Sequence, residues 1–437
     1  MPRRLLALIP LLTACARAQT WDVPNLAAES LSAESLSKAA DKKLKLTFDQ
    51  RGRYESRTGN AFGAEPDYTT GLERWRFGLT YTPAKWLKLS GLAQDARAPW
   101  YGKNASNSLR DHTDLQEGYV ELFPGGKGFG LTVGRQMLNY GETRLIGAPQ
   151  WHPLARTYDS ARAYWRFPKA RLEFLFVSVV KIRTTEFNKP VLGDRIWGTY
   201  NVFPDFYKKH ALDLYLLRHD QNRPGGFTGV GTLQTNTGGF RLYGPIACGF
   251  RYSIEAALQR GHVGPATHRG GAGFASILRP FTVASRALNV SVEYKYASGT
   301  PNPADPTRAS TFDSLSPAAH DKLGHADIFG WRNLHNARSL TSYAITKSFT
   351  LNFIYDNFWL AHVKDAIYNT GSRAIARSTA GTAGRHVGQE ADLYGVYRYK
   401  HFTFGGGYGR FIAGEFVRNA TRGVSPHYLY IFHTYSL

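Results

Sequence analysis

Residues 43–55 read KLKLTFDQRGRYE, and apolar and polar side chains alternate through them. In an extended chain Leu44 and Phe48 fall on one face, whereas Lys45 and Asp49 fall on the other. A soluble sandwich would bury the apolar face against a second sheet. Here the polar face is repeatedly arginine, which predicts a membrane barrel with lipid outside and a wet, basic lumen inside.

The same pattern recurs in segments of about ten residues from 43–55 to 428–437. Short and long connections alternate between the segments, which we count as about 18. An even number of strands returns both chain ends to one side of the membrane, as in bacterial barrels. We therefore predict an all-β, transmembrane, antiparallel up-and-down barrel with long extracellular loops and short periplasmic turns.

Proline and glycine mark the tight turns, which we place at 82–85, 123–126, 167–169, 203–205 and 243–245. Cys248 falls in an expected strand at 247–259, where we assign it a small apolar packing role.

The composition supports this fold class and excludes others. The chain has 437 residues, is 43% hydrophobic, and has only two cysteines, so no disulfide framework supports the fold. A mean hydropathy of −0.35 is too polar for a helical membrane protein. The formal charge of +21 is spread along the strands without a nucleic-acid-binding motif, so we expect no nucleic-acid partner.

The N-terminus has the features of an export signal, with Arg3 and Arg4 before an apolar segment. Cleavage after Ala18 fits a small-residue site, whereas 12–15 also fits a lipobox that would leave Cys15 lipidated. We expect a signal peptide at 1–18, a periplasmic lead-in at 19–42 and the barrel at 43–437, located in the outer membrane.

Strand parity assigns a set of basic side chains to the lumen, because a charge facing the bilayer midplane is costly. The expected pore-lining cations are Arg51, Arg53, Arg74, Arg76, Arg135, Arg162, Arg166, Arg171, Arg241, Arg251, Lys295 and Arg398. The expected pore-lining acids are Asp49, Glu55, Glu173, Glu255, Glu293, Glu390 and Asp392. Five of the arginines are expected mid-strand, at the narrowest depth: Arg74, Arg76, Arg162, Arg166 and Arg251.

These charges have two interpretations. They could pair across strands and hold the wall together. Alternatively, an unpaired surplus of arginine would create a positive field that admits anions and recognises carboxylates.

The longest connection, 298–335, carries enough apolar residues to dock on another part of the protein. We predict that 320–335 folds into the barrel mouth and narrows it, with Trp331 against the wall and Arg332 near the anion path. The constriction residues would be His320, Asp327, Trp331, Arg332 and Asn333. A cap over the rim with no gating role is the alternative.

No catalytic motif and no metal-ligand spacing occur, so we expect no enzyme activity, no metal and no cofactor.

Several pieces of the chain resemble the alginate-export family of outer-membrane porins. They are DLQEGYVEL at 114–122, VGRQ at 133–136, RTYDSAR at 156–162, HDKLGHAD at 320–327 and GWRNL at 330–334. The resemblance implies an 18-strand barrel with an arginine-rich lumen that passes an anionic uronate polymer.

The sequence therefore predicts a channel for an anionic polysaccharide of the alginate type, or for other anionic solutes. A barrel enzyme acting on lipid or polymer, and a general anion-selective nutrient porin, are the alternatives. Expected partners are outer-membrane lipid and lipopolysaccharide, an anionic polysaccharide or oligosaccharide, and the barrel-assembly machinery. We expect a monomer.

Overall fold

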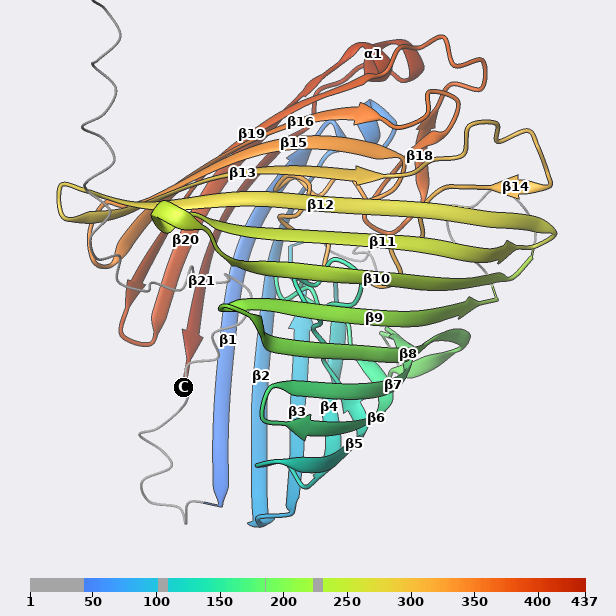
Figure 1. Cartoon of the computed structure of the whole chain (residues 1–437). Helices are drawn as coiled ribbons and strands as arrows, with labels where there is room; N and C mark the ends of the chain where they lie inside the picture. Colours follow the sequence, from blue (N-terminus) through green and yellow to red (C-terminus); the bar gives the residue numbers. More distant parts are fainter. Residues whose placement is uncertain (1–42, 101–108, 185, 223–230) are drawn as a thin grey trace, which may run out of the picture.

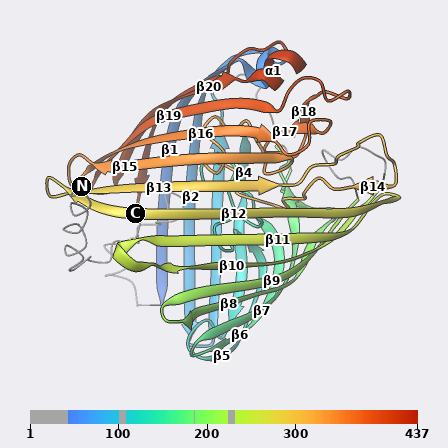
Figure 2. The same ribbon diagram turned by 45° about the horizontal axis from the view of Figure 1, so that its top comes forward.

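The computed structural model describes residues 43–100, 109–184, 186–222 and 231–437. The expected signal peptide and lead-in lie outside these residues. Eighteen long antiparallel strands form one closed wall (Figures 1 and 2). The first pairs with both the second and the last, which closes the barrel and confirms the predicted fold.

The wall strands are, in chain order, β1 Leu44–Thr58, β2 Tyr68–Ala84, β3 Leu87–Arg97, β4 Asp111–Leu122, β5 Gly128–Gln136, β6 Tyr158–Phe167, β7 Ala170–Lys181, β8 Lys189–Tyr207, β9 His210–Gln221, β10 Leu233–Pro245, β11 Arg251–Val263, β12 Ala266–Val283, β13 Arg286–Ala297, β15 Leu334–Ala344, β16 Phe349–Leu360, β19 His386–Tyr399, β20 Phe402–Ala413 and β21 His427–Ser436. Short elements lie in the connections: η1 Asn60–Gly63, η3 Ala247–Gly249, β14 Arg308–Ala309, β17 Ala366–Tyr368, β18 Ala374–Arg377 and α1 Glu415–Ala420. No helix in the described part of the chain is long and apolar enough to span a membrane.

The two faces of the wall differ as the alternation requires. On β2, the outward Trp75 and Phe77 are 39% and 59% exposed, whereas the inward Arg74 and Arg76 are buried. Aromatic and aliphatic side chains therefore cover the outside, where lipid would contact them.

The turn between β8 and β9 lies beyond the predicted position at 203–205. Strand β8 continues through an irregularity after Phe203 to Tyr207, and the chain turns at Lys208 and Lys209, which both have positive φ. Proline is tolerated at such an irregularity because it need not donate a ladder hydrogen bond, so Pro204 does not end the strand.

The prediction that Cys248 lies in a strand is wrong. Strand β10 continues to Pro245 and β11 starts at Arg251, so Cys248 lies in η3 at the turn between them. Its φ is +61° and its side chain is exposed. Cys248 therefore does not have the apolar packing role that the sequence predicts.

Two long connections turn into the barrel. We call residues 137–157, between β5 and β6, loop 3, and residues 298–333, between β13 and β15, loop 7. Phe329 of loop 7 packs on Phe358 of β16 and Phe411 of β20, with ring centroids 4.5 and 5.4 Å apart. The main apolar core therefore lies between loops and wall.

Candidate functional site: the arginine wall and the two inner loops

Four arginines of β1 and β2 hold loop 3 inside the barrel. We call Arg51, Arg53, Arg74 and Arg76 the arginine ladder; each is at most 8% exposed. Both Arg51 and Arg74 donate to the carbonyl oxygen of Gln150, at 2.9 and 3.2 Å. Arg53 donates to the carbonyl oxygen of Trp151, at 2.5 Å. The ladder thus binds a loop backbone as well as lining the wall.

The charges of the arginine ladder are only partly compensated. Arg74 pairs with Asp49 at 2.6 Å, and Arg53 pairs with Glu55 at 3.1 Å. Within the described residues Arg51 forms no ion pair and bonds only to backbone carbonyls. Arg76 likewise bonds to the amide oxygens of Gln94 and Gln150, both at 2.7 Å. Two positive charges are therefore held in place by neutral oxygens.

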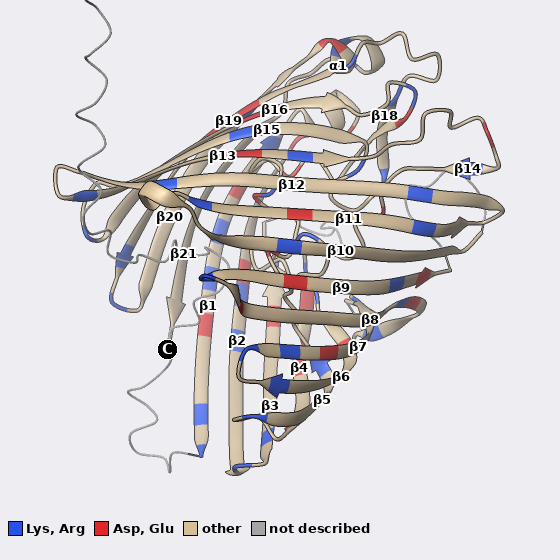
Figure 3. Ribbon diagram, viewed as in Figure 1, with Lys and Arg blue, Asp and Glu red and all other residues tan. Residues whose placement is uncertain are grey.

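Loop 7 is held by carboxylates on β19. Glu390 accepts a hydrogen bond from the backbone N–H of Ala326 at 2.8 Å, and Asp392 accepts one from His325 at 3.3 Å. Figure 3 shows acidic positions interspersed with basic ones along the wall strands. Basic side chains thus bind the carbonyls of one loop and acidic side chains bind the amides of the other.

The two loops also bind each other. The ring of Trp151 in loop 3 stacks on that of His320 in loop 7, with centroids 4.8 Å apart and planes 8° apart. The guanidinium of Arg53 lies 4.4 Å from the Trp151 ring centroid. Ile146 and Ser316 form a parallel β-bridge between the loops. Loops 3 and 7 therefore form one inner unit.

The other end of loop 3 is tied to the opposite wall. Glu142 pairs with Arg241 of β10 at 3.0 Å and accepts a hydrogen bond from Ser253 of β11 at 2.7 Å. Arg144 pairs with Glu142 at 3.0 Å and lies over the ring of Phe274. Burial favours a raised pKa, but Arg144 and Arg241 lower the pKa of Glu142 to about 2. Loop 3 thus crosses the lumen with charged anchors at both ends.

Within loop 7, Nδ1 of His320 and the carboxylate of Asp327 are 2.8 Å apart, within hydrogen-bond distance, and the His320 ring stacks on Trp151. Although burial raises it, the charge of His320 gives the Asp327 carboxyl a net lowered pKa. His320, one of the predicted constriction residues, therefore contacts loop 3 through Trp151.

The remaining constriction residues lie deeper in the loops. Trp331 packs edge-on against Phe312, with ring centroids 5.5 Å apart. Arg332 is 4% exposed and pairs with Asp313 at 2.9 Å. Asn333 is fully buried and joins loop 7 to the backbone of the connection between β16 and β19. The structure does not place Arg332 on an open anion path, because its charge is neutralised inside the loop.

Several other predicted cations pair with acids of the wall. Arg162 and Arg171 share Glu173, at 3.0 and 2.5 Å, and Tyr140 of loop 3 donates to the same carboxylate. Lys295 is buried and contacts Glu293 at 2.7 Å. Glu255, a predicted pore-lining acid, is also buried, and it accepts a hydrogen bond from Tyr215 at 3.1 Å.

The structure contradicts the predicted place of four arginines. Arg135 lies across from Asp159 and shares the outward face of β5 with Val133, so it does not line the lumen. Its side chain pairs with Asp159 at 2.7 Å. Arg166 is next to last in β6, and Arg251 is the first residue of β11, so both lie at the periplasmic rim.

Arg398 is next to last in β19 and is exposed at the same rim. The predicted strand that holds Arg251 begins four residues early, at 247, so Arg251 is the first residue of the strand and not a mid-strand residue. Arg166 and Arg398 lie near the ends of strands whose bounds the sequence predicts well, because parity identifies the face of a residue and not its depth in the membrane.

Two inward arginines were missed. Arg57 donates to the carbonyl oxygen of Ala326 and contacts Asp327, and Arg338 of β15 pairs with Asp356 at 2.9 Å. The signal for Arg57 was present, since the alternation of Arg53 and Glu55 continues to it. Among the described residues, no group of three or more His, Cys, Asp or Glu side chains could hold a metal ion.

A closed 18-strand wall, an apolar exterior and a charged interior define an outer-membrane β-barrel channel. Residues 42–430 match the model of the family described as "Alginate export". The chain belongs to that family.

Solved structures from Pseudomonas aeruginosa share the fold. OccK9 (OpdG) matches with a TM-score of 0.62 and 11% identity, over 91% of this chain and 98% of that chain. OpdK, solved with vanillate, matches with a TM-score of 0.61 and 10% identity, over 91% and 99%. OccK11 (OpdR) matches with a TM-score of 0.61 and 11% identity, over 90% and 96%. No curated protein matches the sequence significantly.

Proposed function

We propose that the protein is a passive channel through which an anionic polysaccharide of the alginate type, or its oligomers, crosses the outer membrane. The observation that carries this proposal is that the positive charges of Arg51 and Arg76 have no carboxylate partner among the described residues. Both point into the barrel, and their described partners are neutral oxygens. An uncompensated positive charge attracts anions and repels cations, most strongly where little water screens it.

Loops 3 and 7 act as the narrow part of the path. They cross the lumen as one unit, fixed to the basic wall, the acidic wall and each other. A polyuronate is a string of carboxylates, and guanidinium groups bind carboxylates in a planar, two-point geometry. The polymer would therefore pass beside the loops, within the positive field of the buried arginines, and its carboxylates would bind these guanidinium groups directly only where loop 3 moves away from them.

A reversal-potential measurement tests the charge argument. The purified protein is inserted into a planar bilayer separating two potassium chloride solutions, and chloride is expected to be favoured. The double substitution Arg51→Gln and Arg76→Gln should reduce the chloride preference by several-fold. Arg97→Gln is the matched control, because Arg97 lies on the outer face and pairs with Asp95. A preference for potassium in the unaltered protein would overturn the proposal.

The second candidate is a channel for small organic anions. The tight seating of both loops favours it, since many contacts must break before a wide pore opens. The vanillate named with OpdK is a compound of this kind. Liposome swelling with uronate oligomers of increasing length separates the two: permeation that stops at the monomer would favour the small-anion channel.

A further inference from the structure

A second group of arginines lies on the outside of the barrel. Arg195, Arg218, Arg260 and Arg269 come from β8, β9, β11 and β12, close to the ends of these strands that carry the outer loops. The lumen and its loops make no use of them.

Register and exposure place this group on the outward face. Arg218 lies beside Trp197 across the β8–β9 pair, and Trp197 is 38% exposed. Two residues towards the periplasm from Arg218 and Arg260 stand Leu216 and Leu258, which are 61% and 72% exposed. Two residues of a strand span roughly 7 Å. The guanidinium groups therefore sit just above the apolar band of the barrel.

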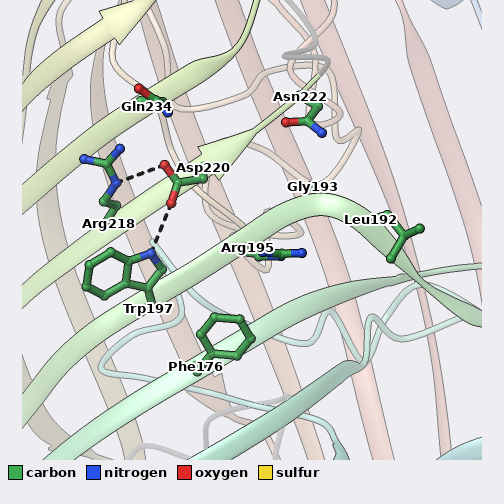
Figure 4. A pocket seen from close by; sticks show the side chains of 9 residues that line it. All are labelled: Phe176, Leu192, Gly193, Arg195, Trp197, Arg218, Asp220, Asn222 and Gln234. Atoms are coloured by element: carbon green, nitrogen blue, oxygen red, sulfur yellow. Dashed lines mark hydrogen bonds and ion pairs between the residues drawn. The ribbon is translucent and has the colours of Figure 1, made fainter.

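The positive charge of this patch is mostly uncompensated. Arg218 pairs with Asp220 at 2.9 Å, and Trp197 donates to the same carboxylate at 3.1 Å (Figure 4). Arg260 and Arg269 are directly opposite each other across the β11–β12 pair. Neither has an ion-pair partner among the residues that the structure describes. Like charges directly opposite destabilise a sheet, so an anion bound between them would relieve the repulsion.

The opposite side of the barrel shows how the same chain neutralises such a position. On β2 and β3, Glu73 lies across from Arg97 in the strand register, and Arg97 pairs with Asp95 at 2.6 Å. The two facing arginines on β11 and β12 thus differ from the strand pair on the opposite side of the barrel, where an acid lies across from the arginine.

The patch is hollowed as well as charged. Two adjoining hollows, of about 660 and 570 Å³, share Arg218 and Gln234. Neutral hydrogen-bonding side chains complete their lining, among them Asn222, Asn236 and Thr267.

We propose that this patch binds the phosphorylated glucosamine headgroup of lipopolysaccharide. Phosphate oxygens suit the forked guanidinium donors, and the sugar hydroxyls suit the amide side chains. The acyl chains would lie against Trp197, Leu216 and Leu258 below. The end of the barrel that carries the long loops faces the outer leaflet, which is where this lipid resides.

The test compares lipid retention. Full-length protein is reconstituted in phosphatidylcholine vesicles containing either bisphosphorylated or phosphate-free lipid A, and the lipid retained after purification is counted by native mass spectrometry. The variant carries Arg260→Gln and Arg269→Gln, and the control carries Arg97→Gln. We expect about a hundredfold weaker retention of bisphosphorylated lipid A in the variant, since it loses two charged donors and each hydrogen bond to a charged group is worth about one factor of ten. The control should match the unaltered protein.

Three outcomes would overturn the proposal. They are equal retention by the variant and the unaltered protein, equal retention of the two lipids, and displacement of the lipid by inorganic phosphate at comparable concentration. Heat-modifiable migration on gels checks that the variant is folded. A second variant, Arg260→Lys with Arg269→Lys, keeps the charge and should retain an intermediate amount of lipid.

Discussion

Arg51 of β1 lies directly opposite Arg74 of β2, so two cations face each other on the inner side of one strand pair. Such a pair destabilises a sheet by itself. Here the carbonyl oxygen of Gln150 accepts a hydrogen bond from each of them. The strand pair and loop 3 are therefore mutually dependent.

The first prediction concerns that dependence. Arg51→Gln removes charged donors to the loop carbonyls of Gln150, Trp151 and His152, which should cost at least about 1.5–3 kcal/mol of local stability. Amide hydrogen exchange at 150–153 should become faster, while exchange in β8 and β9 stays unchanged. Arg97→Gln serves as the control. Unaltered exchange at 150–153 would show that the ladder does not hold the loop.

The second prediction uses the two faces of β2. Trp75→Glu puts a charge among lipid-facing side chains. A basic residue facing the midplane costs about 2–4 kcal/mol, and a glutamate costs less but is still unfavourable, so membrane assembly should decrease. Arg74→Glu faces the lumen and should leave assembly largely intact. The measurement is the fraction of heat-modifiable barrel on gels. Normal assembly of Trp75→Glu with failure of Arg74→Glu would mean that the faces are reversed.

A third prediction addresses the contact between the loops. Trp151→Ala and His320→Ala each remove the stack, and in a double-mutant cycle the coupling should be about 0.5–1.5 kcal/mol. In single-channel records both variants should show larger or noisier currents. Additive effects of the two substitutions would indicate that the stack does not couple the loops.

A fourth prediction follows from the buried imidazole of His325 in loop 7. Burial, with a smaller effect of His320, lowers its pKa to about 3, against about 6.5 in an unfolded chain. Between these values the unfolded loop binds the proton and the folded loop does not, so stability falls as the pH falls below about 6.5. The loss at pH 5 is about 2 kcal/mol.

The charged or titratable groups around His325 are His320, Asp321, Asp327 and Arg338, which all act on the pKa of its imidazole. Channel conductance should therefore rise on acidification from pH 7 to 5, and His325→Gln should weaken that dependence. A conductance that is constant over this range would contradict the seating of loop 7 on a neutral His325.

The fifth prediction tests orientation. Cys248 is exposed in the turn between β10 and β11, on the side opposite loops 3 and 7. A membrane-impermeant maleimide should label it after the outer membrane is permeabilised and not in intact cells, with Cys248→Ser as the control. Equal labelling in intact cells would place this turn outside.

The sequence predicted the wall well because alternation is a local signal. All 18 predicted segments overlap wall strands, and the lipid-facing residues of β2 are those expected from parity. The turn at Lys208 and Lys209 could not be foreseen, because two lysines with positive φ have no compositional signature while nearby Pro204 suggested a turn.

The inner unit was harder to predict for a different reason. The arginine ladder binds backbone carbonyls about a hundred residues away, and every residue offers a carbonyl. Nothing in the sequence therefore marks Gln150 or Trp151 as the partner. Loop 7 was expected in the barrel mouth from its apolar content, but its union with loop 3 depends on contacts between two irregular segments.

The closing strand pair has a consequence for how the protein is made. Leu437 exchanges two backbone hydrogen bonds with Phe48, and Ser436 donates a side-chain hydrogen bond to Asp49, 387 positions earlier in the chain. Until β21 has been synthesised and exported, the sheet that begins with β1 has two open edges, which are prone to pair with other chains. Long-range pairing of this kind is also slow. The incomplete sheet therefore needs chaperones that cover its edges, and a deletion of β21 would prevent the pairing that closes the barrel.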